Sequence, residues 1–211
     1  MGWEVLALLA SLLGAVWFLW RLISRRQSMP CPAWLSWMVD NPVSMRRTSA
    51  TLDQLELRRG LAVLDGGCGP GRLAVPIAEA VGPVGSVLAV DVQGEMLRRA
   101  RAKADKAMLG NIEFLHASLG EGKLPAAHFD RAVMSTVLGE IPDRVAALRE
   151  IHRALKPGGF LLVNEVIGDP HYQSLARVRA MAQEAGFRPG LLVGSWMAYS
   201  LRLDKEKVHA D

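Results

Sequence analysis

Residues 61–71 constrain the fold of this chain more than any other stretch, because an apolar run leads there directly into a glycine-dense turn. The apolar run ends at Asp65, and the pattern of a helix follows the turn. Glycine suits such a turn because it adopts backbone conformations that other residues avoid and lets a ligand approach the main chain closely. The pattern therefore predicts a buried strand, a tight ligand-binding loop and a helix. The glycines of the predicted loop are Gly66, Gly67, Gly69 and Gly71.

A second apolar strand is predicted for residues 86–91, and it ends in a carboxylate, Asp91. At the end of the second strand of a nucleotide-binding βαβ unit, a carboxylate can accept hydrogen bonds from both ribose hydroxyls. The glycines at alternate positions, Gly67, Gly69 and Gly71, differ from the G-x-G-x-x-G spacing that is usual in dinucleotide enzymes. A Rossmann-like domain that binds another nucleotide is the alternative at this point.

With these features in place, the whole of residues 50–203 resembles the class I S-adenosylmethionine (SAM)-dependent methyltransferases. The resemblance implies SAM as the cofactor. It also implies an α/β, Rossmann-like sheet of seven strands in the order 3-2-1-4-5-7-6, the last of them antiparallel. The motifs that carry the resemblance are residues 63–71, 90–97, 129–130, 138–143 and 155–159.

Strand and helix patterns alternate from residue 51 onward, as expected for a doubly wound α/β fold. Because the carboxyl ends of parallel strands meet at one edge of such a sheet, we expect the ligand site at that edge. Helices are predicted at residues 51–59, 71–81, 94–108, 142–155 and 172–185. Strands are predicted at residues 61–65, 86–91, 112–116, 129–135, 160–167, 191–195 and 197–203.

Each strand end at that edge can be interpreted by what it offers to SAM. The glycine loop over residues 66–71 offers backbone N–H groups and a helix N-terminus to the methionyl carboxylate. Asp65 is expected to receive the ammonium group, directly or through water, and Asp91 to bind the ribose. Val92 and Met96 are expected to pack on the adenine.

The resemblance also assigns the ends of the third and fourth strands. The family often places a carboxylate after the third strand, facing the adenine amino group, whereas this chain has Ser118 there. That departure removes one expected cofactor contact. Ser135, at the end of the fourth strand, is predicted to bind the cofactor, and the loop over residues 135–140 is expected to meet the methyl acceptor.

Glu140 and His171 are the predicted catalytic residues. Glu140 could take a proton from the nucleophile or stabilise a developing positive charge, or it could simply cap the helix predicted to begin near Pro142. His171, after the fifth strand, could act as a base near neutral pH. A strong base is needed only for a protonated and weakly acidic acceptor, because the cofactor carries the difficult chemistry of methyl transfer.

The N-terminal segment is strongly apolar. Residues 5–20 contain no charge and lie between Glu4 and Arg21. With its apolar flanks the segment covers residues 3–23, close to the ~20 residues that a helix needs to cross ~30 Å of hydrocarbon. We therefore predict a single transmembrane anchor over residues 1–27 that contacts the lipid bilayer through residues 3–23. The arginines that follow place the catalytic domain in the cytoplasm by the positive-inside rule. A signal peptide, a buried helix and a helix in the plane of the membrane surface are the alternatives.

The other boundaries follow from composition and motifs. Residues 28–50 are predicted to be a juxtamembrane linker and lid. Within them, the tryptophan-containing residues 33–39 either lie on the membrane over the active site or pack on the domain as a cap. Residues 51–204 form the predicted methyltransferase domain, and residues 205–211 are a polar tail.

The composition narrows the partners. Basic residues exceed acidic ones only modestly, 25 against 21, and no aromatic-rich basic stripe accompanies them, so no nucleic acid is expected. The two cysteines, Cys31 and Cys68, lie in unrelated segments, so neither a disulfide nor a metal site is predicted. The sequence makes no prediction about the oligomeric state.

The function predicted from these observations is that of a membrane-anchored, SAM-dependent methyltransferase. The anchor and the tryptophan-containing segment favour a small, lipophilic acceptor: a lipid, a quinone precursor, a thiol or a phenol. The alternatives are methylation of a membrane-bound protein and a SAM-binding scaffold without catalysis.

Overall fold

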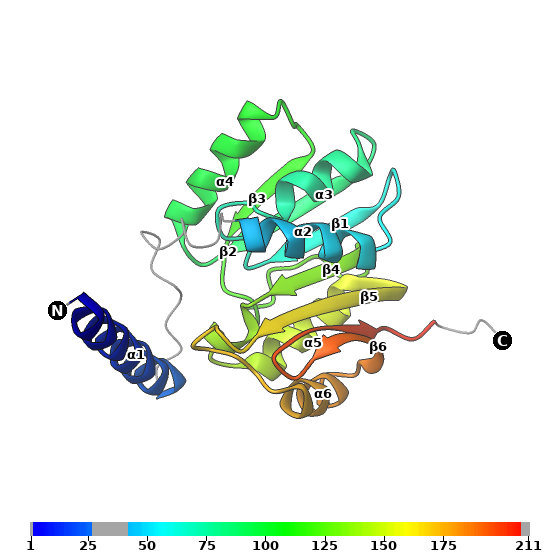
Figure 1. Ribbon diagram of the computed structural model, residues 1–211. Coiled ribbons are helices and arrows are strands. Elements are labelled where there is room, and N and C mark those ends of the chain that lie inside the picture. The colour runs from blue at the N-terminus through cyan, green and yellow to red at the C-terminus, as the bar shows by residue number, and fades with distance from the viewer. Residues whose placement is uncertain (1, 27–41, 208–211) are drawn as a thin grey trace.

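The computed structural model describes residues 2–26 and 42–207. At its centre is a seven-stranded β-sheet in the order β3-β2-β1-β4-β5-β7-β6 (Figure 1). Neighbouring strands from β1 to β5 run parallel, and β7 runs antiparallel to both β5 and β6. The predicted α/β fold class and strand order are thus confirmed. The strands are β1 (Ala62–Gly66), β2 (Ser86–Asp91), β3 (Ile112–His116), β4 (Phe129–Ser135), β5 (Leu155–Val166), β6 (Arg188–Ser195) and β7 (Ala198–Asp204).

Helices cover both faces of this sheet. Residues of α2, α3 and α4 pack on one face, and residues of α5 and α6 pack on the other. A short 3₁₀ helix, η2 (Leu138–Glu140), follows β4. The α-helices are α1 (Gly2–Arg26), α2 (Pro42–Gln54), α3 (Ala74–Val81), α4 (Gly94–Lys106), α5 (Arg144–Ala154) and α6 (Leu175–Glu184).

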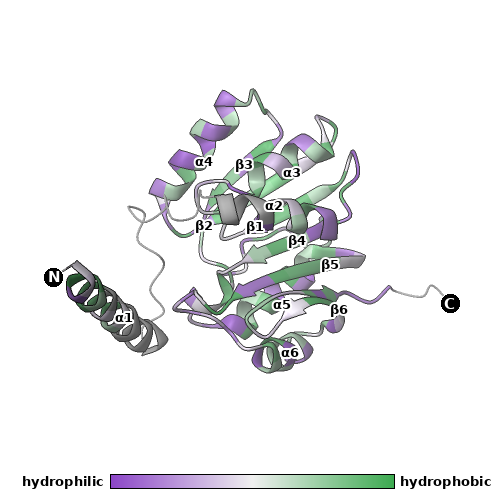
Figure 2. Cartoon of the chain, in the orientation of Figure 1, coloured by the Kyte–Doolittle hydropathy of each residue, from purple (hydrophilic) through white to green (hydrophobic). Residues whose placement is uncertain are grey.

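Two apolar cores result, because successive residues of a strand point to opposite faces of the sheet. Val63 of β1 packs in the same core as Ile77 of α3. Its neighbour Leu64 packs in the other core, together with Leu148 of α5. Figure 2 shows hydrophobic residues along the central strands and hydrophilic ones along α4. With both faces covered, the carboxyl ends of the parallel strands are the natural place for a ligand.

The bounds of several elements differ by a few residues from the predicted ones, and those of α2 and β5 differ most. The helix expected at residues 51–59 coincides only with the last turn of α2, which ends at Gln54. That helix already begins at Pro42, a residue suited to the first helical position because it lacks an N–H. The strand expected at 160–167 begins earlier, at Leu155, which pairs with Phe129 of β4 before a register shift. The predicted interfacial segment at residues 33–39 and Cys31 lie outside the described residues.

The N-terminal helix α1 was predicted to be a transmembrane anchor. Within the part of the chain that the structure describes, no helix combines the length and the apolar composition needed to cross a membrane. The structure therefore gives no support to the predicted single-pass anchor.

Candidate active site

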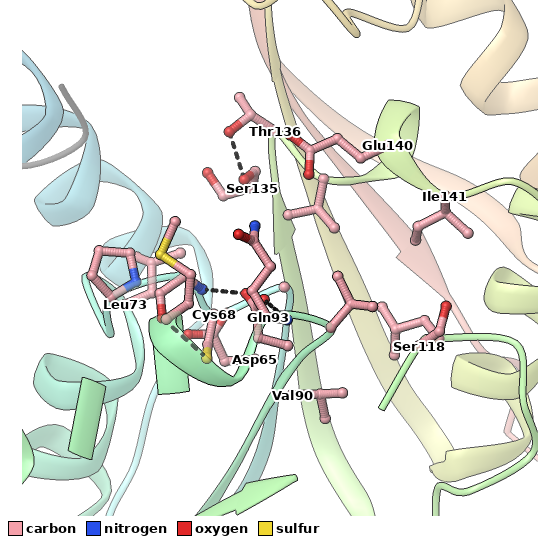
Figure 3. A pocket seen from close by; sticks show the side chains of 18 of the residues that line it. Asp65, Cys68, Leu73, Val90, Gln93, Ser118, Ser135, Thr136, Glu140 and Ile141 are labelled. Atoms are coloured by element: carbon pink, nitrogen blue, oxygen red, sulfur yellow. Dashed lines mark hydrogen bonds between the residues drawn. The ribbon is translucent and has the colours of Figure 1, made fainter. Parts of the chain in front are cut away.

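A cavity of about 300 Å³ lies at the carboxyl ends of the parallel strands. It occupies the point where the strand order reverses, because β1 has β2 on one side and β4 on the other. Loops from both halves of the sheet line it (Figure 3). The lining residues fall within five segments: 65–73 after β1, 90–96 after β2, 117–119 after β3, 135–142 after β4, and Asp169 after β5.

The glycine loop is fixed to the end of β2 by its own backbone. The N–H groups of Gly67 and Cys68 both donate to the carbonyl oxygen of Val90, at 2.8 and 2.9 Å. Gly67 has a φ of +76°, and a Cβ at this position would overlap the side chain of Val137. Gly71 has a φ of +81°, and a Cβ there would lie 3.0 Å from the Cβ of Ala100 in α4. Glycine is therefore needed at both positions, for conformation and for close packing.

Asp91 is held rigidly at the wall of the cavity. Its Oδ2 accepts a hydrogen bond from the N–H of Gly69 at 2.9 Å, and its Oδ1 accepts one from the N–H of Gln93 at 2.8 Å. Burial raises the pKa of this carboxyl, and the two N–H groups oppose that shift. Each carboxylate oxygen keeps capacity for a further donor, so the side chain can still bind hydroxyl groups.

Asp65 is almost fully buried at the same cavity, and its Oδ2 has no hydrogen-bond partner among the described residues. Burial and the nearby Asp91 carboxylate raise its pKa to about 7, while the Arg72 guanidinium opposes the shift. An unpartnered buried carboxylate oxygen is costly, and a cationic group in the cavity would offset that cost. The ammonium group of SAM is such a cation, so the residues present fit this cofactor.

Arg72 lines the cavity but was not singled out from the sequence. Its Nη1 donates to Thr48 Oγ1 at 2.7 Å, and its Nη2 donates to Ser135 Oγ at 3.0 Å. The side chain thus joins α2, the glycine loop and the end of β4. In the sequence, only its position directly after Gly71 could have indicated that Arg72 belongs to the site, since its partners Thr48 and Ser135 are distant in the chain.

The far end of the cavity is formed by the loop after β4 and the 3₁₀ helix η2. Figure 3 shows Thr136 and Glu140 at one end of the cavity and Asp65 and Val90 at the other. Thr136 has a φ of +56°, in the left-handed region, and its N–H donates to the carbonyl oxygen of Asn164 at 2.8 Å. Strain of this kind costs about 1–3 kcal/mol and is concentrated at functional sites.

His171 lies behind the cavity wall rather than on it. It is not among the lining residues, and its side chain is only 3% exposed. Its Nδ1 lies 3.8 Å from Glu140 Oε1 and 3.6 Å from Asp169 Oδ1. Glu140 and Asp169 do line the cavity. A direct contact between an acceptor and a side chain of this cluster would therefore involve the carboxylates, and Asp169 was not among the residues predicted for the site.

The structure brings most of the predicted site residues together. Val92 is half-exposed and Met96 is buried, and both line the cavity. Gly66, Gly71 and His171 do not line it. The described residues contain no group of three or more His, Cys, Asp or Glu side chains placed to hold a metal ion. The predicted residues that line the cavity are Asp65, Gly67, Gly69, Asp91, Val92, Met96, Ser118, Ser135 and Glu140.

Residues 63–159 match the family model described as a methyltransferase domain. Among solved structures, a SAM-dependent methyltransferase from Aquifex aeolicus superimposes with a TM-score of 0.76 and is 25% identical in sequence. That match covers 83% of this chain and 99% of the Aquifex chain. The similarity therefore extends beyond the strands that carry the motifs to most of the described fold.

Two curated relatives are each similar to about half of the chain. A demethylmenaquinone methyltransferase from Listeria welshimeri is 36% identical over 111 residues, which are 53% of this chain and 47% of the relative. A ubiquinone/menaquinone biosynthesis C-methyltransferase from Pseudomonas fluorescens is 39% identical over 116 residues, 54% of this chain and 45% of the relative. The chain thus spans about half the length of the curated relatives that it matches.

Proposed function

We propose that this chain, which belongs to the class I SAM-dependent methyltransferases, transfers a methyl group from SAM to a small, lipophilic acceptor. The observation that carries the proposal is the pair of carboxylates in one cavity. Asp91 is fixed by the N–H groups of Gly69 and Gln93, and Asp65 is buried with an oxygen that lacks a partner among the described residues. These are the needs of a ligand that presents both ribose hydroxyls and an ammonium group.

The other polar groups of the cofactor also have candidate partners. Asp65 would bind the ammonium group, and Arg72 with the backbone of the glycine loop would bind the carboxylate. Asp91 would bind the ribose. Val92, Met96 and Ser118 would surround the adenine, because they line the cavity beyond β2 and β3. When bound, SAM supplies an electrophilic methyl group on a sulfonium sulfur.

The residues beyond Ser135 have a different task. They must hold the acceptor in line with the methyl group and keep water away, and this positioning supplies much of the acceleration. Thr136, Val137 and Ile141 line this end of the cavity. The strained backbone at Thr136 is anchored to β5 through Asn164, so the acceptor end is built on the sheet.

A quinone precursor or phenol is the favoured acceptor. Val137, Ile141 and Pro142 provide an apolar wall for a flat ring. One of the two curated relatives is named as a demethylmenaquinone methyltransferase and the other as a C-methyltransferase of ubiquinone/menaquinone biosynthesis, which supports the same substrate class. Methylation of a membrane-bound protein would instead require a peptide to reach the same cavity.

We further propose that α1 attaches the protein to the membrane, with the catalytic domain in the cytoplasm where SAM is made. Large apolar side chains along α1 are exposed, among them Leu6 at 68% and Leu12 at 62%. A helix with exposed apolar side chains and arginines in its C-terminal part is suited to a lipid surface. Attachment would bring the cavity to a lipophilic acceptor that is itself dissolved in the bilayer.

Flotation with phosphatidylcholine–phosphatidylglycerol vesicles tests this attachment. The protein should float with the vesicles, and Leu6→Glu combined with Leu12→Glu should release it. Val84→Glu is the matched control, because Val84 is 75% exposed on the catalytic domain. Equal flotation of all three proteins would contradict attachment through α1.

Calorimetric titration of SAM and of S-adenosylhomocysteine tests the cofactor site. Asp91→Ala should abolish micromolar binding, whereas Asp105→Ala, on the exposed side of α4, should not change it. Absence of binding to the folded wild-type protein would overturn the proposal. Radiolabel from SAM should then enter the organic fraction of membranes; label in the protein fraction would indicate a protein acceptor, and label in neither would indicate a scaffold.

A further inference from the structure

Two loops meet behind the acceptor end of the cavity without any space between them. One follows β4 and carries Gly139 and Glu140, and the other follows β5 and carries Asp169 and His171. A Cβ added to Gly139 would overlap the backbone carbonyl group of His171. The two loops are therefore packed main chain against main chain. This close packing gives Glu140 and Asp169 a fixed separation at the cavity wall.

The imidazole of His171 lies between those two carboxylates. Its Nδ1 is 3.6 Å from Asp169 Oδ1 and 3.8 Å from Glu140 Oε1. Both distances exceed a hydrogen bond, so a small movement of the ring brings Nδ1 within range of either oxygen. The ring's Nε2 is buried and has no partner among the described residues.

The loop that carries His171 is itself anchored to the sheet. The backbone N–H of His171 donates to Asp169 Oδ1 at 2.6 Å, and Gln173 Nε2 donates to the carbonyl oxygen of His171 at 2.7 Å. The hydroxyl of Tyr199 in β7 donates to the carbonyl oxygen of Gln173 at 2.8 Å. These bonds hold the main chain at His171 and the carboxylate of Asp169 in place, whereas the imidazole ring can still make the small movement described above.

We propose that Asp169 and Glu140 recognise an acidic hydroxyl group on the acceptor, that Asp169 receives its proton, and that His171 is the positioning residue between the two carboxylates. The inference rests on the proposed methyltransferase function and narrows its substrate class to phenols and hydroquinones. The apolar wall takes the ring, and the carboxylates take the hydroxyl. Charge-assisted hydrogen bonds of this type are about twice as strong as neutral ones.

The protons balance whether the methyl group is transferred to an oxygen or to a ring carbon of the acceptor. The hydroxyl O–H bond breaks, and its proton moves to the carboxylate of Asp169. The electron pair left on the acceptor forms the new bond to the methyl carbon, while the pair of the breaking carbon–sulfur bond stays on sulfur. If a ring carbon is methylated, the ring proton is then lost to Glu140 and the oxygen regains its proton from Asp169. One proton is released in either case.

The experiment measures binding of two probes with the same apolar body to the full chain loaded with S-adenosylhomocysteine. They are 2-naphthol and its methyl ether, 2-methoxynaphthalene. We expect 2-naphthol to bind at least tenfold more tightly than the ether, because only the alcohol can donate a hydrogen bond to a carboxylate. Equal binding of the alcohol and the ether would overturn the inference. Loading with S-adenosylhomocysteine is measured first, so a failure of the cofactor site is distinguished from a failure of the acceptor site.

Variants identify the side chains that cause the preference for 2-naphthol over its methyl ether. Asp169→Asn and Glu140→Gln should each reduce the preference for 2-naphthol over the ether severalfold while S-adenosylhomocysteine affinity stays unchanged. Asp105→Asn is the control for loss of a carboxylate elsewhere. For any hydroxyl acceptor that is turned over, His171→Ala should lower kcat and leave KM within about twofold, and His171→Gln should restore part of kcat. A preference that survives in both carboxylate variants, or a loss in KM alone for His171→Ala, would overturn the assigned roles.

Discussion

The backbone N–H of Gly69 donates to Asp91 Oδ2 at 2.9 Å and so joins the glycine loop to the carboxylate at the end of β2. Through this bond, the glycine loop, which would bind the carboxylate of the cofactor, also fixes the side chain of Asp91, which would bind the ribose. In the chain, α3 and most of β2 lie between Gly69 and Asp91, yet the two residues are joined directly at the cavity. Substitutions in the loop should therefore affect the whole cofactor site.

Gly67→Ala should destabilise the protein more than Gly122→Ala does. Both glycines have nearly the same φ, +76° and +77°, so both substitutions carry the left-handed strain of ~1–2 kcal/mol. A Cβ at Gly122 meets nothing within 4 Å, whereas one at Gly67 overlaps Val137. Overpacking should add about 1–3 kcal/mol to the loss in the free energy of unfolding, measured in urea.

Val137→Ala gives the second half of this test. It removes the methyl groups that a Cβ at position 67 would meet, so Gly67→Ala should cost less in the Val137→Ala background. The Gly122→Ala cost should be the same in both backgrounds. An unchanged cost for Gly67→Ala would mean that strain alone, and not the contact with Val137, explains the glycine.

Arg72→Gln should weaken SAM binding about tenfold, equivalent to about 1.4 kcal/mol. The substitution removes the positive charge beside the cavity and the bonds to Thr48 and Ser135. Thr48→Val is the matched control, because it removes only the bond to α2. It should leave the affinity within about twofold in the same calorimetric titration. An equal loss in both variants would show that Arg72 serves only to hold α2.

Local patterns were sufficient for much of the fold. The predicted bounds of β2 and β3 agree with the structure at both ends, because each is an apolar run between turn residues. The early turns of α2 were not predicted, since residues 42–50 are polar and lack an apolar stripe. The early start of β5 was not predicted either, because a Pro-Gly-Gly sequence reads as a turn.

The site was predictable where a residue's position in a strand end determines its role. Asp65 and Asp91 follow from their strands and lie together at the cavity. Arg72 and Asp169 could not be found in this way. Arg72 depends on Thr48 and Ser135, which are 24 and 63 positions away. Asp169 depends on the packing of two loops that only the tertiary structure brings together.

Asp65 should make the stability fall as the pH rises from about 4 to about 7. Its pKa is raised from 3.8 to about 7, chiefly by burial. In this window the folded state holds a proton that the unfolded carboxyl has released, so raising the pH favours unfolding. Above pH 7 the carboxyl is ionised in both states and the slope ends. The free energy of unfolding should fall by at most roughly 4 kcal/mol over this range, since each pKa unit corresponds to about 1.4 kcal/mol.

Urea unfolding of the wild type and of Asp65→Asn between pH 4.5 and 8.5 measures this effect. The difference between the two proteins isolates Asp65 from other groups. The wild type should lose stability relative to the variant as the pH rises to 7. Saturating SAM should reduce the loss, because an ammonium beside the carboxylate favours its ionised form. Parallel curves for the two proteins would contradict the assignment.

Glu165→Gln should be tolerated and should become more favourable as the pH rises. Glu165 is buried in β5, and burial raises the pKa of its carboxyl to about 8. Its Oε2 accepts a hydrogen bond from the N–H of Gln173 at 3.0 Å, and Oε1 has no partner among the described residues. A glutamine keeps an oxygen for that N–H and never ionises. The wild type should therefore lose stability between about pH 4.5 and 8, and the variant should not.

Glu165→Leu separates the hydrogen bond from the charge. It leaves the N–H of Gln173 without its acceptor and should cost about 1–3 kcal/mol at every pH. Gln173 also anchors the loop that carries Asp169, since its side chain bonds to the carbonyl oxygen of His171. The leucine variant should thus lower the affinity for 2-naphthol, while the glutamine variant keeps it. If Glu165→Gln retained the wild-type slope in urea unfolding, another group would have to carry the pH dependence.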